Sequence, residues 1–266
     1  MKYISFPTDA DFSKNQRLLL PNIAIDLVLT TNSNKFAVIS NTEDDKYDIL
    51  FKECYLMLAT CELDSNIQWG ISETLSNGGV CRYYYPQGYI KKFGISKGDF
   101  SFSKPNLFEG SKLPSKFYVV MMSSEKCDSP KHNSQPLEFK SYGIKKIECR
   151  LDNQNIGQTY ENIDFNNSKY LQLYSGYVNT LDSSKKPVRF LTHKKYGKKC
   201  IMGFTLSQSG KEGYITESRK GNVSLEITLN SGASESINLY IFYKKYHLCS
   251  VSQKDPENLE ITDTEL

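Results

Sequence analysis

Hydrophobic positions along the chain predict a protein rich in β-strands. Residues 116–122 form a continuous apolar run with Val and aromatic side chains, which predicts a strand buried on both faces. In residues 145–151 apolar and charged side chains alternate, which predicts a strand with one wet face. Residues 223–229 and 237–243 alternate in the same way on either side of a five-residue turn. These two segments predict a β-hairpin.

The first third of the chain predicts further strands. Residues 22–30 alternate, with Ile23 and Ile25 on one face and Asp26 on the other. Residues 36–40 predict a returning strand, and residues 47–63 predict a long strand that passes into a covered interior. The next apolar segment carries Pro86 and Gly88 near its middle, so residues 80–95 predict two strand pieces with a bend.

Two segments change to a helical period. Apolar residues recur every four positions after Asp64, which predicts a short surface helix over residues 64–76 that Gly78 and Gly79 end. Residues 168–181 predict a second helix, with Asn167 or Ser168 as the N-cap. Its apolar face would contain Tyr170, Leu173, Tyr174, Tyr177 and Leu181.

Together these elements predict an all-β, antiparallel jelly-roll β-sandwich with one or two short surface helices. The strands do not alternate with long helices, which disfavours a parallel βαβ architecture. Spacing alone does not distinguish a jelly roll from other sandwiches. We expect an N-terminal arm over residues 1–17, a single jelly-roll domain over residues 18–253, and an acidic, disordered tail over residues 254–266.

A series of short motifs runs through the middle of the chain. It comprises Leu107-Phe108, Gly110, Leu113-Pro114, Phe117, Val119-Val120-Met121, Pro136-Leu137, Phe139, Tyr142, Ile144 and Ile163-Asp164-Phe165. This ordered series resembles the C-terminal half of Polinton/Maverick-type and virophage-like double jelly-roll major capsid proteins. Residues 18–29 and 47–58 are similar to the family's second jelly roll, and the resemblance covers residues 15–180.

The resemblance implies a structural, non-enzymatic capsid protein, viral or transposon-derived, that self-assembles through the flanks of its jelly roll. The implied partners are other copies of the chain, other capsid proteins and a separate first jelly-roll half. That half is expected because family members carry two jelly rolls, whereas this chain begins with Met1 shortly before the second one. The segment over residues 107–114 is one residue longer than the family pattern, which implies a changed loop.

Composition and charge limit the classes of protein, and the cellular compartments, that we expect for this chain. The formal net charge is +3, from 33 basic and 30 acidic residues, and this balance differs from the clear basic excess of a nucleic-acid-binding domain. No apolar run is long enough for a membrane span, and the first residues lack the apolar region of a signal peptide. We therefore expect an intracellular protein, in the cytoplasm or nucleus before assembly, that ends in a virion or capsid-like particle. The seven Cys are then reduced, mostly core, residues.

Motifs for catalysis and metal binding are missing from the sequence. There is no phosphate-binding Gly-rich loop, no G-x-S-x-G nucleophile motif and no CxxC pair. The three His residues each lack a second ligand at metal-binding spacing; the nearest pair is His193 with Cys200. We therefore expect neither an enzyme nor a bound metal or cofactor.

One basic stretch has a functional interpretation. It contains Lys185, Lys186, Arg189, Lys194, Lys195, Lys198 and Lys199. One alternative is a solvated loop that keeps the domain soluble; the other is an electrostatic contact with nucleic acid or an acidic neighbour, such as the acidic tail of another copy. Phe190 and Tyr196 lie between the charges and would suit base stacking.

A second function class stays open beside the capsid hypothesis. A single jelly roll can act as a binding module for a carbohydrate or a protein partner, because a fold does not determine function. Tyr83, Tyr84, Tyr85 and Tyr89 are candidates for a ligand-binding aromatic face, or equally for core residues.

Overall fold

The structure, a computed structural model, divides into two compact units. It describes residues 17–20, 23, 25–26, 28–42, 49–51, 55, 57–108, 112–181, 191–206, 220–255 and 258–265. The first unit combines residues 1–31, 48–87 and 246–266, and the second combines residues 32–47 and 88–245. The single jelly-roll domain over residues 18–253 stays a prediction, and two long strands run through both units.

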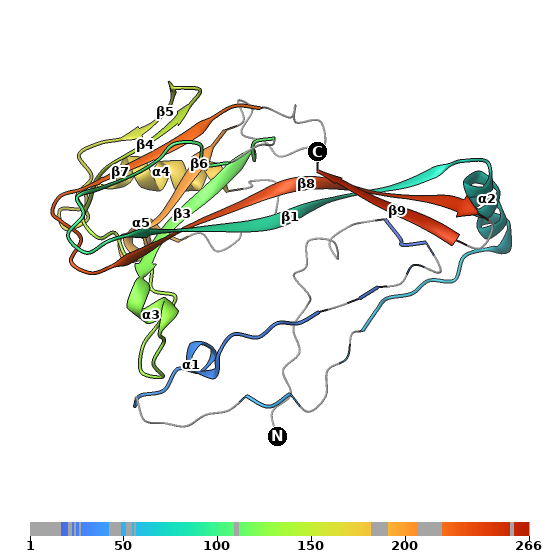
Figure 1. Cartoon of the computed structure of the whole chain (residues 1–266), viewed down its shortest axis with the longest axis horizontal. Coiled ribbons are helices and arrows are strands. Elements are labelled where there is room, and N and C mark those ends of the chain that lie inside the picture. Colours follow the sequence, from blue (N-terminus) through green and yellow to red (C-terminus); the bar gives the residue numbers. More distant parts are fainter. Residues whose placement is uncertain are drawn as a thin grey trace. The chain divides into compact units, whose positions relative to one another are not determined.

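The second unit is a sandwich of two antiparallel sheets (Figure 1). One sheet has the order β1 (Val80–Ile95), β8 (Ile237–Asp255), β3 (Lys116–Ser123) and β6 (Ile201–Thr205). The other has the order β2 (Ser101–Lys104), β7 (Val223–Leu229), β4 (Ile144–Leu151) and β5 (Gln154–Tyr160). Strands β1 and β8 continue beyond this unit into the first one.

The strand order is that of an eight-stranded jelly roll. Strand β1 neighbours β8, β2 pairs with β7, β3 pairs with β6, and β4 pairs with β5. The first strand thus lies beside the eighth, the second beside the seventh, the third beside the sixth and the fourth beside the fifth. This is the strand order of an antiparallel ribbon rolled into two Greek keys. The predicted fold class, an all-β antiparallel jelly-roll sandwich with short helices, is confirmed.

The predicted hairpin over residues 223–243 is wrong. Strand β7 pairs with β2 and β4, whereas β8 pairs with β3 and β9 in the other sheet. The connection over residues 230–236 therefore crosses from one sheet to the other. Alternation requires only that both strands have one apolar face, and two strands on opposite sides of a sandwich core satisfy that requirement as well as two neighbours do.

The core lies between the two sheets of the second unit. Its residues in β3 are Phe117, Val119 and Met121, and Val120 and Met122 on the opposite face are also buried. The prediction of a strand buried on both faces is confirmed. In β4, Ile147, Cys149 and Leu151 are buried. The expected wet face of β4 is partly wrong, because Glu148 is buried there between basic neighbours.

Helix α4 (Leu171–Thr180) covers β6 and confirms the second predicted helix. Its buried face contains Leu173 and Tyr177, and Tyr170, the N-cap in place of the predicted Asn167 or Ser168, is also buried. Gly203 on β6 allows the close approach, because a Cβ atom there would lie 2.4 Å from Thr180 Oγ1. The short helix α5 (His193–Tyr196) places Tyr196 beside this contact, with its ring 5.5 Å from that of Tyr177. Two further short helices are α1 (Asn34–Ala37) and α3 (Ser124–Asp128).

The first unit contains α2 (Ser65–Ser76), one half of β1, one half of β8, and β9 (Asn258–Glu265). Helix α2 confirms the predicted surface helix: the Asp64 side chain accepts a hydrogen bond from the Asn66 N–H, and Gly78 follows with a φ of +81°. The tail expected to be disordered differs, because β9 pairs antiparallel with β8 through its described residues. The pairing runs from His247 opposite Glu265 to Asp255 opposite Asn258.

Strands predicted before residue 64 are not found among the described residues. The described residues of segments 22–30 and 47–63 have no strand, and α1 occupies the start of segment 36–40. The rest of those segments and residues 1–16 of the expected arm lie outside the described residues. Strand β1 runs through Pro86 without the predicted break, although the two units divide between residues 87 and 88.

Candidate functional site

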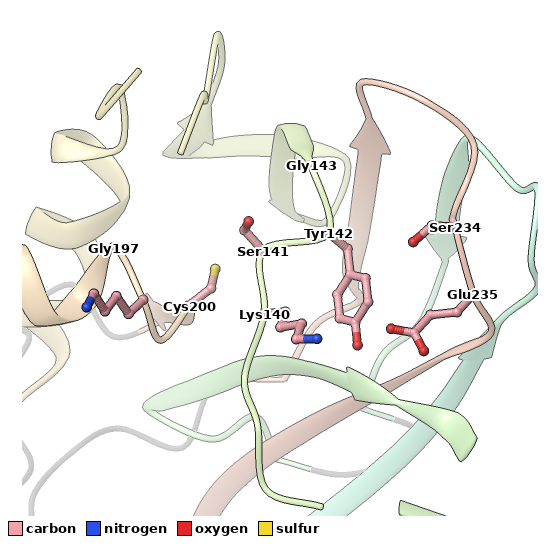
Figure 2. A pocket seen from close by; sticks show the side chains of 9 residues that line it. Lys140, Ser141, Tyr142, Gly143, Gly197, Cys200, Ser234 and Glu235 are labelled. Atoms are coloured by element: carbon pink, nitrogen blue, oxygen red, sulfur yellow. The ribbon is translucent and has the colours of Figure 1, made fainter. Parts of the chain in front are cut away.

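A polar pocket opens in the jelly-roll unit where three connections between strands meet (Figure 2). Its volume is about 380 Å³. The lining residues are Lys140, Ser141, Tyr142, Gly143, Gly197, Lys198, Cys200, Ser234 and Glu235. They come from the segment before β4, from the segment between α5 and β6, and from the crossing between β7 and β8. We call this cavity the polar pocket.

The turn before β4 places the Tyr142 ring in the pocket. Tyr142 and Gly143 have φ values of +46° and +67°, and the Ile144 N–H donates to the Ser141 carbonyl at 3.0 Å. Two successive residues in the left-handed region are typical of a tight turn that favours Asn-Gly. An aromatic residue in this region costs roughly 1–3 kcal/mol. The fold therefore holds Tyr142 in a conformation that its own backbone disfavours.

The Tyr142 hydroxyl lies close to the Glu235 carboxylate. Its oxygen is buried. Figure 2 shows it pointing towards the Glu235 carboxylate. Burial raises the pKa of the Tyr142 hydroxyl, and the negative charge of Glu235 and its hydrogen bond with the hydroxyl raise it further, so the group stays protonated. Glu235 is therefore the polar neighbour of this buried hydroxyl.

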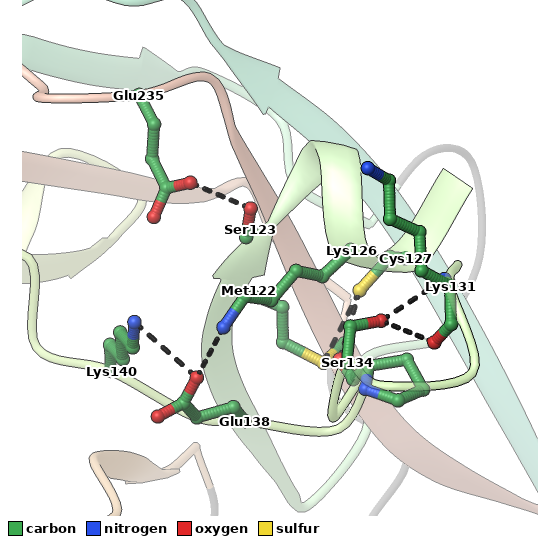
Figure 3. Close-up of polar contacts among 10 residues, drawn as sticks. Met122, Ser123, Lys126, Cys127, Lys131, Ser134, Glu138, Lys140 and Glu235 are labelled. Atoms are coloured by element: carbon green, nitrogen blue, oxygen red, sulfur yellow. Dashed lines mark hydrogen bonds and ion pairs between the residues drawn. The ribbon is translucent and has the colours of Figure 1, made fainter. Parts of the chain in front are cut away.

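A network of polar contacts supports the acidic wall of the pocket (Figure 3). The Ser123 hydroxyl donates to Glu235 Oε2 at 2.7 Å. Lys126 Nζ lies 2.9 Å and Lys140 Nζ 3.3 Å from Glu138 Oε2. The hydrogen bond from Lys126 lowers the pKa of Glu138, and Lys140 lowers it further, against the effect of burial. These contacts restrain Glu235 and Lys140, which line the pocket.

Cys200 lines the same cavity without supplying a nucleophile. Its side chain is buried, and burial raises the pKa of the thiol to about 12. A thiol with that pKa is neutral near pH 7, whereas the thiolate is the reactive form. Cys149 is buried in the same neutral state, while Cys61 is exposed, so the prediction of core cysteines fails at that position.

The predicted basic stretch is described only in part. Lys185, Lys186 and Arg189 lie outside the described residues. Lys194, Lys195, Lys198 and Lys199 are all exposed, in α5 and the segment after it. Lys198 alone of these four lines the polar pocket. Sequence reasoning missed the pocket; the one signal for it was the Tyr-Gly pair between two strand-like segments.

The tyrosine cluster does not form one face. Tyr83 is fully buried in the first unit, and its hydroxyl donates to the Leu18 carbonyl and accepts from the Leu20 N–H, each at 3.1 Å. Tyr84 follows on the opposite face of β1. Tyr89 belongs to the second unit, where its ring stacks on Tyr243 at 5.3 Å. Tyr83 and Tyr89 are thus packed within separate units, as the core interpretation expects.

The histidines have different surroundings. His247 lies 3.2 Å from Asp263 Oδ2 on the neighbouring strand, so it does not stand alone as its sequence position indicates. His193 lies stacked on Tyr170 with a buried Nε2 atom that has no partner among the described residues. Within the described ranges, no three His, Cys, Asp or Glu side chains gather in a way that could hold a metal ion. No helix in the same ranges has the length and apolar character to cross a membrane.

Comparison with known proteins gives one sequence relative and several structures. No family model matches the chain. An uncharacterized protein of Caenorhabditis elegans is 23% identical over 226 residues, which cover 82% of this chain and 53% of the relative. The chain thus spans about half the length of the curated relative that it matches.

The similar solved structures include viral capsid proteins. The mavirus major capsid protein shares 12% identity at a TM-score of 0.37, over 70% of this chain and 41% of that one. A chain of the Sputnik virophage structure shares 13% identity at a TM-score of 0.38, over 70% and 39%. A PBCV-1 protein that was fitted into a reconstruction of the virophage Sputnik shares 8% identity at a TM-score of 0.42, over 75% and 54%.

Proposed function

We propose that this chain is a structural, non-enzymatic protein of capsid type that self-assembles with copies of itself through the flanks of its jelly roll. The strand order supports the jelly-roll part of the proposal. The ordered motifs between residues 107 and 165 support an origin among Polinton/Maverick-type and virophage-like elements, as a virus or a derived copy. Because a fold hosts many functions, assembly needs an observation of its own.

That observation is the apolar surface of the N-terminal third. Among the described residues, 21 large hydrophobic side chains are exposed, and twelve of them lie between residues 18 and 58. Eleven of these twelve belong to the first unit, and we call these eleven the N-terminal apolar segment: Leu18, Leu19, Ile25, Val28, Leu29, Ile49, Leu50, Phe51, Tyr55, Met57 and Leu58. Val28 and Met57 are 84% and 88% exposed.

Exposed apolar residues in such number favour burial against a partner. Each Å² of apolar surface that is removed from water contributes about 25 cal/mol. Scattered exposed apolar side chains are ordinary, whereas concentrated ones mark interaction surfaces. The partner that we propose is a second copy of the chain; a separate first jelly-roll half is the other partner that this surface would suit.

Light scattering over a range of concentrations, with negative-stain imaging of the same sample, tests self-assembly. We expect trimers, larger rings or shells to form as the concentration rises. A monomer at every concentration would overturn the proposal. The double variant Val28→Lys/Met57→Lys should weaken association by at least about tenfold, since two charges would enter an apolar contact. Leu171→Lys is the matched control, because Leu171 is 65% exposed outside the segment.

The proposed function also implies a cellular location and further partners. A protein that assembles in this way would reside in a capsid-like particle and, before assembly, in the cytoplasm or nucleus. Lys194, Lys195, Lys198 and Lys199 present a basic surface that suits nucleic acid or an acidic neighbour. A steep salt dependence of association would favour such electrostatic contacts over apolar ones. A second candidate function, a module that binds carbohydrate, is favoured by the polar pocket.

A further inference from the structure

We propose that self-assembly joins copies of this chain head to tail, with the first unit of one copy docked on the second unit of the next and Trp69 buried in the contact. This inference rests on the proposed function, since it names the two surfaces through which the copies would meet. The charges of the two units, the distribution of exposed apolar side chains and the position of the single Trp support it.

The two units carry opposite net charges. Residues 1–31, 48–87 and 246–266 contain 6 basic and 13 acidic residues, which give the first unit a formal net charge of −7. Residues 32–47 and 88–245 contain 27 basic and 17 acidic residues, which give the second unit +10. Two units of the same kind repel each other, whereas a first and a second unit from different copies attract each other. Charge therefore favours a head-to-tail contact.

The first unit also carries most of the exposed apolar side chains. Of the 21 large hydrophobic side chains that are exposed among the described residues, fifteen belong to this unit. Those outside the N-terminal apolar segment are Ile67, Trp69, Val80 and Ile261, which lie on α2, β1 and β9. The negative charge of the unit disfavours an anionic membrane as the partner of this surface. A basic protein surface with apolar side chains suits it better.

Helix α2 presents the residue that we expect to be buried on docking. No residue of α2 is buried, and the side chain of Trp69, the single Trp of the chain, is 68% exposed. Glu73 is the one charged residue of α2, so the helix lacks the basic polar face of a membrane-surface helix. Trp is enriched among the residues that contribute most to the affinity of protein contacts. A protein partner therefore explains an exposed Trp on this helix.

The second unit offers a matching apolar face. The odd-numbered residues between 237 and 243 of β8 belong to the core, so Tyr240 and Phe242 lie on the side of the sheet away from it. Their stacked rings are 6.4 Å apart, and both residues are half-buried. Lys92 Nζ of the neighbouring β1 lies 5.9 Å from the centre of the Tyr240 ring. Ile90 lies two residues before Lys92, hence on the same side of β1, and is 63% exposed.

Basic residues border this apolar face. Lys92 also pairs with Asp128 at 2.6 Å, and Lys244 follows Phe242 on the same side of β8 and is exposed. We call Ile90, Lys92, Tyr240, Phe242 and Lys244 the outer face of β1 and β8. An apolar centre with a polar rim is the usual composition of a protein interface. The basic rim and the net charge of +10 fit the acidic first unit of another copy.

Complementation between two variants of the full chain tests the head-to-tail contact. Trp69→Lys alters the first-unit surface and Ile90→Asp alters the outer face of β1 and β8; each should weaken self-association by at least about tenfold. A 1:1 mixture should form heterodimers at a concentration where each variant alone is monomeric. The reason is that the Ile90→Asp copy keeps Trp69 and the Trp69→Lys copy keeps Ile90. Light scattering measures both, and circular dichroism checks that the variants fold.

A control and the contrary outcomes complete this test. Phe100→Asp should associate like the wild type, because Phe100 is exposed in the second unit outside the outer face. Self-association of the Ile90→Asp variant at wild-type strength, or a mixture without heterodimers, would overturn the head-to-tail contact and leave self-assembly standing. A wild-type chain that stays monomeric would instead overturn the proposed function itself.

Intrinsic fluorescence gives an independent measurement on the wild type, because Trp69 is the single Trp. As the chain associates, we expect emission to shift to shorter wavelength and quenching by acrylamide to fall by about threefold, since Trp69 leaves water. Raising the salt from about 0.05 M to about 0.5 M should weaken association by about tenfold. Unchanged emission in an associated sample, or association that is equally tight at both salt concentrations, would contradict the contact that we propose.

Discussion

Glu148 is a charged residue that is buried in strand β4 of the sandwich. Its side chain is only 8% exposed, yet its carboxylate accepts a hydrogen bond from Arg150 Nε at 2.8 Å and lies 3.3 Å from Lys146 Nζ. The hydrogen bond from Arg150 lowers the pKa of Glu148, and Lys146 lowers it further, against the effect of burial. The ion pairs therefore more than offset the desolvation of the carboxylate.

Replacing Glu148 tests this balance. Glu148→Gln should lower the free energy of unfolding by about 1 kcal/mol near pH 7, a modest figure because both basic partners are half-exposed. A lowered pKa stabilises the fold above the ordinary carboxyl value of 4.5 and loses that effect as the pH falls. The difference between wild type and variant should therefore shrink below about pH 4.5.

Urea denaturation at pH 7 and pH 3 measures the effect. Glu226→Gln is a suitable control, because Glu226 lies opposite Glu148 on β7 but is exposed. We expect it to change the stability by less than about 0.5 kcal/mol. A difference in stability between wild type and Glu148→Gln that is the same at both pH values would contradict the role of the ion pairs.

At the scale of elements, the close packing of helix α4 on strand β6 favours glycine at position 203. A Cβ atom on Gly203 would lie 2.4 Å from Thr180 Oγ1 and 3.0 Å from the Tyr177 Cα. The Tyr177 Cα is a backbone atom of α4, so the helix itself would have to move away from β6. We expect Gly203→Ala to destabilise the protein by about 1–3 kcal/mol.

Thermal denaturation compares this variant with Gly94→Ala. Gly94 lies in β1 with no atom within 4 Å of the added Cβ, so Gly94→Ala should be neutral or slightly stabilising. Equal effects of the two substitutions would show that the contact of α4 with β6 does not require glycine at position 203.

Strand β9 depends on a cluster that spans three strands of the first unit. Asp263 Oδ2 accepts from the Tyr85 hydroxyl of β1 at 3.0 Å and lies 3.2 Å from His247 Nδ1 of β8. We expect Asp263→Ala to increase amide hydrogen exchange over residues 259–264 by about fivefold or more, because these contacts attach the edge strand. Glu260→Ala on the same strand is the control. Similar exchange in both variants would mean that backbone pairing alone holds β9.

At the scale of the whole molecule, the main hydrophobic cluster belongs to the second unit. All residues of the main hydrophobic cluster lie between Ile95 and Tyr243, and strands β2 to β7 lie entirely within residues 88–245. The fragment over residues 88–245 should therefore fold cooperatively by itself, with a single melting transition in circular dichroism.

A shorter fragment provides the control for this prediction. Residues 88–236 lack β8, which lies between β1 and β3. Without it, β1 loses its neighbour in the sheet and the core loses Ile237, Leu239 and Ile241. We expect this fragment not to fold. If the longer fragment also failed to fold, the first unit would have to contribute to the stability of the jelly roll.

Local patterns predicted much of the fold and little of the candidate site. Burial of β3 on both faces, the apolar face of α4 and the capped start of α2 at Asp64 all follow from neighbours within a few residues. The polar pocket does not, because Tyr142, Lys198 and Glu235 come from three connections far apart in the chain. The basic stretch was visible in the sequence, but the separate position of Lys198 in the pocket was not.

The sequence by itself determined which side chains seek burial, and hence the all-β class, because strand and helix periods are properties of consecutive residues. Only the tertiary structure decided how the strands pair: β7 and β8 lie in different sheets although a short connection joins them. It also decided that β9 extends a sheet, while the N-terminal apolar segment stays exposed. Strand pairing depends on which edges are available in space, and alternation within one strand carries no information about that.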